Sequence, residues 1–192
     1  LHTLWGGALN RPFAMMLAAA WEERFGERAE CIADNDCVAL TCSASAPSVD
    51  LFALVPAARR DALLRNQLEQ TGFFGARFRE CAGVALLCPK SSADRRMPLW
   101  MSRERAKKLL DAVIDYPDFP ILLETWRTCL QDAFDLDALY GKLDAVAAGE
   151  IRVSAVETER PSPFAEGLGW QRINDLMYRD DTPTAGRPSA LA

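Results

Sequence analysis

Residues 1–26, LHTLWGGALNRPFAMMLAAAWEERFG, pass from a short strand-like segment through a pair of glycines into a long apolar run. The segment Leu1–Trp5 is predicted to be a strand, and Gly6–Gly7 interrupts it. Beyond the glycines, apolar residues recur every three or four positions, which is typical of a helix with one buried face. We therefore predict a helix over 12–25 that begins after an Asn10 cap, with a proline in its first turn.

Two further segments carry a strand pattern. Residues 29–33 and 37–42 are apolar runs that flank Asp34–Asp36, a turn-forming sequence, and together they predict a hairpin. Residues 151–157 alternate apolar and polar side chains, which also suits a strand. Because these strands are few and far apart in sequence, we expect a helix-rich α+β fold, in which several helices pack on a small, mainly antiparallel sheet.

The rest of the chain is predicted to be helical after a linker that opens at Pro47. A polar loop over 89–98 separates two of the helices. The predicted helices cover residues 57–70, 72–87, 99–115, 119–131, 136–148 and 166–179. Three tryptophans, Trp5, Trp21 and Trp126, lie in apolar patterns and are expected in the core. We predict one accessory domain over 1–179 and a flexible tail over 180–192.

Charge is spread unevenly along the chain. Its 22 Lys+Arg and 27 Asp+Glu give a net charge of −5, yet residues 77–108 hold nine basic and only three acidic residues. That stretch carries +6, so the rest of the chain carries −11. A local cationic stripe that contains Trp100 is suited to tracking a phosphate backbone. The acidic remainder favours a module that forms one wall of a larger groove over a free-standing nucleic-acid binder.

Each candidate contact in this stripe has a structural alternative. The candidates are Arg77, Arg79, Arg95, Arg96, Trp100 and Arg103. The two arginines of the 72–87 helix avoid its apolar face, so they either contact phosphate or are ordinary solvated residues. Arg103 shares a helix face with Lys107, and such charges also keep a helix soluble. For Trp100 the pattern favours packing against the sheet over stacking on a base.

Several kinds of site are not supported by the sequence. The six cysteines form no C-x-x-C pair and His2 is the only histidine, so we expect six reduced thiols in a reducing cytosol and no metal. No phosphate-binding G-x-x-x-x-G-K-[ST] loop, G-x-S-x-G elbow or H-E-x-x-H motif is present, and we predict no catalytic residue. No apolar run is long enough to span a membrane. The chain begins at Leu1 without Met, which favours a fragment of a longer protein.

Blocks of sequence that occur in a fixed order along the chain resemble one known family. They are Leu4–Ala14 (LWGGALNRPFA), Phe74–Glu80 (FGARFRE), Pro98–Trp100 (PLW), Tyr116–Thr125 (YPDFPILLET), Cys129–Asp132 (CLQD), Gly149–Val153 (GEIRV) and Arg160–Ala165 (RPSPFA). With these blocks, the chain resembles the DEAD/H-associated domain of large helicase-related (Lhr) proteins, which are superfamily 2 DEAD/DEAH-box helicases. The resemblance runs from Leu1 to about Thr182.

The resemblance implies an accessory domain that follows two RecA-like motor domains and a winged-helix domain. Such a domain helps to form the channel for single-stranded DNA or RNA:DNA in a cytoplasmic helicase. ATP and magnesium would be cofactors of the parent helicase, with none in this fragment. Family members often carry a basic residue where this chain has Ala8, and Arg11 would be the nearest substitute as a nucleic-acid contact. The alternative is a docking module that braces the motor domains without touching nucleic acid.

Overall fold

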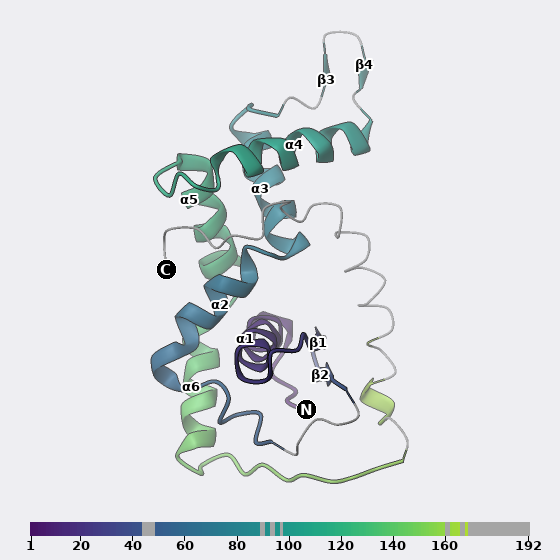
Figure 1. Ribbon diagram of the computed structural model, residues 1–192, viewed down its shortest axis with the longest axis vertical. Coiled ribbons are helices and arrows are strands. Elements are labelled where there is room, and N and C mark those ends of the chain that lie inside the picture. Colours follow the sequence, from purple (N-terminus) through teal and green to yellow (C-terminus); the bar gives the residue numbers. More distant parts are fainter. Residues whose placement is uncertain are drawn as a thin grey trace. The chain divides into compact units, whose positions relative to one another are not determined.

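The computed structural model describes residues 1–43, 49–88, 91–92, 95–96, 98–159, 162–165 and 168 (Figure 1). These residues form two compact units, one built from Leu1–Gln67 and the described residues from Phe134 onward, the other from Leu68–Ala133. The described residues confirm a helix-rich α+β fold with antiparallel strands. The predicted helix over 166–179 and the domain boundary at 179 lie outside the described residues, apart from Leu168.

The elements follow the predicted order, with shifted ends. The helices are α1 (Gly7–Phe25), α2 (Arg60–Leu68), α3 (Gly72–Val84), α4 (Leu99–Val113), α5 (Pro120–Arg127) and α6 (Leu136–Ala147). The strands are β1 (Glu30–Ala33), β2 (Val38–Thr41), β3 (Ser91–Ser92) and β4 (Arg95–Arg96). A π-helical turn over Thr128–Ala133 follows α5, and short 3-10 turns cover Ala57–Arg59 and Pro163–Ala165. The predicted polar loop over 89–98 therefore contains the β3–β4 hairpin, which the polar sequence did not indicate.

The start of α1 differs from its prediction. The helix begins at Gly7, and the residue before it, Gly6, has φ 85° and ψ 156°, a backbone conformation that is accessible almost only to glycine. The predicted Asn10 cap is wrong, because Asn10 lies inside the helix. Pro12 also lies inside α1 and has no N–H for the carbonyl of Ala8. That carbonyl instead accepts a hydrogen bond of 3.3 Å from the backbone N–H of Asp135, so the proline leaves α1 an acceptor that joins it to the start of α6.

Asn10 is fully buried and connects three segments of the first unit. Its Oδ1 accepts a hydrogen bond of 2.7 Å from the Thr3 hydroxyl. Its Nδ2 donates to the backbone carbonyls of Asp34 at 2.9 Å and Asn35 at 3.2 Å. The Asn35 Oδ1 in turn accepts from the Gly7 N–H at 2.9 Å. One amide side chain thus joins the N-terminal segment, α1 and the β1–β2 turn.

The predicted β1–β2 hairpin is confirmed, with Glu30 opposite Thr41 and Ala33 opposite Val38. The other two predicted strands are not formed. Among the described residues, residues 1–5 contribute only an isolated bridge between His2 and Cys37, and residues 151–157 pair with no strand. The expected single sheet is therefore replaced by two described hairpins, β1–β2 and β3–β4. All of the predicted strand segments have a strand-like sequence, but among them only 29–33 and 37–42 contain residues that pair in a described sheet.

The core of the first unit forms around α1, with the β1–β2 hairpin beside it (Figure 1). Buried apolar side chains come from α1, α2 and α6, namely Phe13, Met16, Leu17, Leu63, Leu64, Leu139 and Leu143. Trp21 is in this core as predicted, whereas Trp5 is only half-buried, with its ring 6.1 Å from that of Phe13. A buried Arg60 on α2 pairs with Asp144 on α6 at 2.8 Å, which fastens these two helices together.

In the second unit, α3 packs against both α4 and α5. Phe74 and Phe78 of α3 are fully buried, and the Phe74 ring lies 4.9 Å from that of Trp126, which confirms Trp126 as a core residue. The buried stripe of α3 ends at Ala82. The helix ends at Val84, three residues before the predicted end at 87, and Ala85 and Leu86 are exposed beyond it.

The Asn10 amide network yields a stability prediction. Asn10→Ala removes three side-chain hydrogen bonds and leaves the turn carbonyls of Asp34 and Asn35 without that donor. We expect the free energy of unfolding to fall by about 2–3 kcal/mol in urea titrations. The control Arg28→Ala breaks an exposed pair with Glu22 and should cost less than about 0.5 kcal/mol. Equal losses in the two variants would contradict the role assigned to the amide.

Candidate nucleic-acid interface

The structure distributes the predicted contacts over four elements. Arg77 and Arg79 lie on α3, Arg95 and Arg96 form β4, and Trp100 and Arg103 lie on α4, all in the second unit. Arg11 is exposed on α1 and belongs to the first unit. The structure therefore groups six of the seven candidates on α3, α4 and the hairpin between them, whereas Arg11 belongs to the other unit.

The two arginines of α3 already have partners inside the protein. Arg77 donates to Glu80 at 2.7 Å, its guanidinium lies 5.2 Å from the centre of the Phe73 ring, and its side chain is 34% exposed. Arg79 is half-buried and also has an interaction partner. Both side chains lie off the Phe74–Phe78 face, as predicted. The Glu80 carboxylate reduces the positive potential that Arg77 presents to an external phosphate, so α3 is less suited than α4 to binding an anion.

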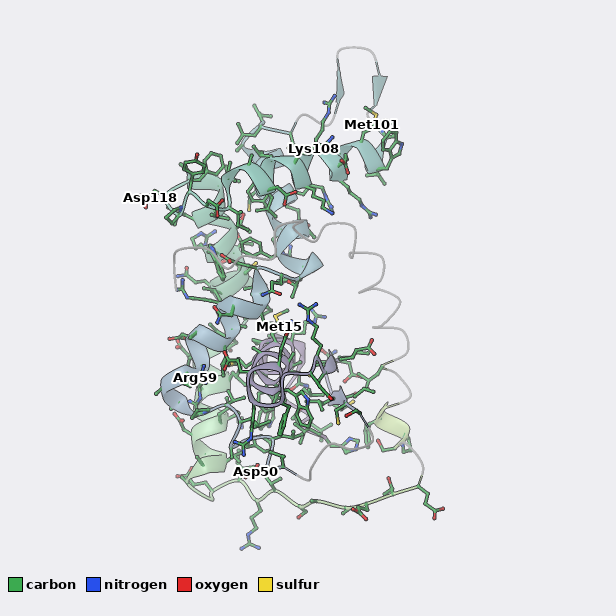
Figure 2. The ribbon with its side chains drawn as sticks, viewed as in Figure 1. Met15, Asp50, Arg59, Met101, Lys108 and Asp118 are labelled. Atoms are coloured by element: carbon green, nitrogen blue, oxygen red, sulfur yellow. The ribbon has the colours of Figure 1, made fainter. Side chains whose placement is uncertain are left out.

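Helix α4 presents an aromatic side chain and two cations on one face. Trp100, Arg103 and Lys107 are spaced i, i+3 and i+7, which places them in line along the helix. Arg103 and Lys107 are half-buried beside the apolar stripe, and no described residue forms an ion pair with either of them. Figure 2 shows the side chains that extend from α4, with Met101 and Lys108 labelled. We call Trp100, Arg103 and Lys107 the α4 face.

A second group of cations lies on a different side of the same helix. Arg105 and Lys108 are both exposed, and Lys108 is paired with Glu104 at 3.3 Å. Helical geometry rotates Lys108 by about 100° from Lys107, so the two neighbours point in different directions. The helix thus contains two groups of equal charge, and only one of them is in line with the tryptophan.

The exposure of Trp100 corrects its predicted packing, because its side chain is 68% exposed. The reason is the position along α4 at which its side chains become buried. Leu99 is on the same face as Ala106 and Leu110, yet Leu99 is exposed and only the other two are buried. Burial therefore starts about two turns into α4, and the first turns extend beyond the surface that covers the rest of the helix.

The β3–β4 hairpin leads directly into this exposed start of α4. Arg95 pairs with Ser92 and Arg96 with Ser91 in an antiparallel register. Trp100 is four positions after Arg96, which limits their Cα atoms to about 14 Å apart even in a fully extended chain. The backbone therefore keeps both arginines of β4 close in sequence and space to the α4 face. Lys107 was not among the predicted contacts, although its i+7 spacing from Trp100 was a usable signal.

The described residues offer little for metal or thiol chemistry. Among them, no cluster of three or more His, Cys, Asp or Glu is suited to holding a metal ion. The six cysteines are free thiols. Burial raises the pKa of Cys31 and Cys129 to about 12 and that of Cys37 to about 11, so these thiols stay protonated and unreactive at neutral pH. None of the described helices has the length and apolar character needed to cross a bilayer.

Known proteins resemble this chain over most or all of its length. Residues 1–165 match the DEAD/H-associated family. The Escherichia coli (strain K12) Lhr helicase/uracil glycosylase is 36% identical over 194 residues, which cover 100% of this chain and 12% of that protein. The Methanothermobacter thermautotrophicus ATP-dependent helicase Lhr-Core is 25% identical over 94% of this chain and 21% of its own.

One solved structure also matches, that of the Mycobacterium smegmatis helicase Lhr bound to ssDNA and AMP-PNP. The TM-score is 0.77 at 37% sequence identity, and the match covers 87% of this chain and 21% of that one. The present chain therefore spans between about an eighth and a fifth of these relatives. The family match, the sequence identity and the common fold agree: the chain belongs to the DEAD/H-associated family and is homologous to Lhr helicases along its whole length.

Proposed function

We propose that this chain is the accessory domain of an ATP-dependent superfamily 2 helicase and that it guides single-stranded nucleic acid along the motor domains, as part of the channel wall. The observation that carries the proposal is the α4 face, where an exposed tryptophan is in line with two cations that have no ion-pair partner among the described residues. The relative from Mycobacterium smegmatis was solved with ssDNA bound, which supports the same class of ligand.

The α4 face has the chemistry that single-strand binding requires. An indole ring stacks on any base, and cations beside it neutralise the phosphates of neighbouring nucleotides without reading sequence. Along α4, Arg103 lies about 4.5 Å and Lys107 about 10.5 Å from Trp100 in axial rise. The two arginines of β4 would extend the cationic path on the other side of the tryptophan. Such a surface supplies one wall and requires another domain to close the groove.

Nucleotide hydrolysis would belong to other parts of the parent helicase. The chain has no phosphate-binding loop, and the absence of such a motif gives ATP and magnesium no evident ligands here. We propose that the RecA-like and winged-helix domains of the same polypeptide are its neighbours, and that ATP turnover in those motor domains moves the strand along this wall.

Because α4 carries two pairs of cations on different sides, two double variants can test whether the α4 face binds the strand. In the parent helicase, Arg103→Ala/Lys107→Ala should weaken single-strand affinity about tenfold or more, because two phosphate contacts are lost. The slope of log affinity against log salt should become less steep by about 0.7 for each lost contact. Affinity at several salt concentrations, measured by fluorescence anisotropy with labelled DNA and RNA strands, gives both quantities.

The control Arg105→Ala/Lys108→Ala removes the same charge from another side of α4. We expect its affinity and salt slope to stay within about twofold of the parent, because these side chains point away from the α4 face and Lys108 is already paired with Glu104. If the two double variants weakened binding equally, the effect would be one of net charge, and the assignment of a specific face would be wrong.

Trp100 provides a separate test of base stacking. Trp100→Ala in the parent should reduce single-strand affinity by about 5- to 150-fold, which corresponds to about 1–3 kcal/mol for one stacked base. Trp100→Phe keeps an aromatic ring and should retain most of the affinity. An alanine variant that binds as well as the parent would remove Trp100 from the interface.

A second candidate, a docking module that braces the motor domains, is favoured by the exposed apolar end of α3. Val84, Leu86 and Leu87 are all exposed there. Leu86 has φ 61° and follows the end of the helix, at a position usually occupied by glycine, while the Leu87 N–H closes the turn on the Ala82 carbonyl at 2.9 Å. An 81% exposed leucine in a left-handed conformation contributes nothing evident to this fold, so a contact outside the chain would explain it.

Leu86→Gly separates docking from folding. Glycine tolerates the left-handed conformation, so we expect the domain to become more stable by about 1 kcal/mol in urea titrations. If the end of α3 docks on the motor domains, the same variant should bind the separately purified motor domains about tenfold more weakly. A more stable variant that binds them unchanged would contradict docking through this surface.

A further inference from the structure

Residues 151–157, IRVSAVE, follow α6 as an extended segment without a strand partner in the described chain. The C-terminal turn of α6 is closed by hydrogen bonds from the Glu150 and Ile151 N–H groups to the Ala145 carbonyl. From Arg152 to Glu157 the backbone makes no hydrogen bond with any described residue. The segment thus has a sequence that favours a strand, and its backbone donors and acceptors have no partner among the described residues.

The side chains of this segment are exposed on both faces. Alternation along an extended chain places Val153 on one face and Val156 on the other. Val153 is 53% exposed and Val156 is 80% exposed. The uncharged residues 153–156 lie between Arg152 and Glu157, which are also exposed. β-branched residues in the middle and charges at the two ends suit a short strand whose register is limited by its ends.

Both ends of the segment are held on the first unit. At its start, Gly149 adopts φ 78° and ends α6. After it, the Phe164 carbonyl accepts a hydrogen bond of 3.4 Å from the Cys37 thiol, and the Phe164 ring lies 5.6 Å from that of His2. Figure 1 shows the extended run that follows α6. Because both ends are anchored, less conformational entropy is lost when the middle pairs.

We propose that residues 152–157 become a strand by adding to one exposed edge of a sheet that belongs to another part of the parent polypeptide. In this mode, main-chain hydrogen bonds supply the attraction and side-chain pockets supply the specificity. The occupant is assigned to the same polypeptide because this chain spans only 12% of the Escherichia coli relative, and covalent linkage gives such a sheet a high effective concentration. The inference does not depend on nucleic-acid binding by α4.

Hydrogen exchange of the intact parent helicase tests the pairing directly. Amides that point to a partner strand should exchange at least about tenfold more slowly than the intrinsic rates of an unstructured chain. Mass spectrometry of peptides that cover 151–159 reports this protection, and the β1–β2 hairpin serves as the internal reference for a folded domain. Exchange at the intrinsic rate throughout 152–157 would overturn the proposal.

A pair of proline variants distinguishes strand addition from side-chain docking. Along a strand paired on one edge, alternate N–H groups point to the partner, so proline at neighbouring positions differs in effect. Val153→Pro and Ser154→Pro in the parent should therefore behave unequally. One variant should lose the protection of the segment about tenfold, and the other should retain it within about threefold. Protection that survives in both variants, or is lost equally in both, would overturn addition to a single edge.

Discussion

The rest of the first unit depends on the buried amide of Asn10. Its acceptor holds Thr3, and its donor groups hold the two carbonyls of the β1–β2 turn, so three segments meet at one side chain. This arrangement requires α1 to begin at Gly7, because a start at residue 12 would leave Asn10 outside the helix and away from the turn. Gly6 makes the early start possible through its positive φ. Because Pro12 has no N–H, the Ala8 carbonyl is free to accept a hydrogen bond from the backbone N–H of Asp135, the N-cap residue of α6.

The candidate interface shows that cations clustered in the sequence are not equally available on the surface. The basic stretch 77–108 includes cations that are neutralised within their own helix, such as Arg77 by Glu80 and Lys108 by Glu104. Arg103 and Lys107 have no such partner among the described residues, and they are in line with an exposed Trp100. The α4 face is therefore smaller than the basic stretch 77–108. It is exposed because the buried residues of α4 begin only at Ala106.

Three apolar features of this chain remain exposed where a self-sufficient domain would bury them. They are the start of α4, the end of α3 and the segment 152–157. Exposed apolar residues that occur singly are common on protein surfaces. A left-handed leucine, and a strand-forming segment without a partner in the described chain, are better explained by a contact with a neighbour. This chain spans about an eighth to a fifth of its relatives, and the exposed features agree with the proposal that other domains of a longer polypeptide cover them.

Local chemistry by itself determined most helices, the β1–β2 hairpin and several ends of elements. Asp34–Asp36 forms the predicted turn, in which the Asp34 carboxylate accepts from the Asp36 and Cys37 N–H groups. Asp135 caps α6 through the Ala138 N–H, and periodic leucines identify the buried faces of α2 and α6. The blocks quoted above likewise identified the family. Tertiary structure decided the rest, because residues 1–5 and 151–157 have strand propensity but a strand also requires a partner edge. In the same way, neither the periodicity of α4 nor the indole of Trp100 reveals how much of that helix a neighbouring element covers. Burial and strand pairing depend on the elements that pack around a residue, and local sequence patterns do not show which elements those will be.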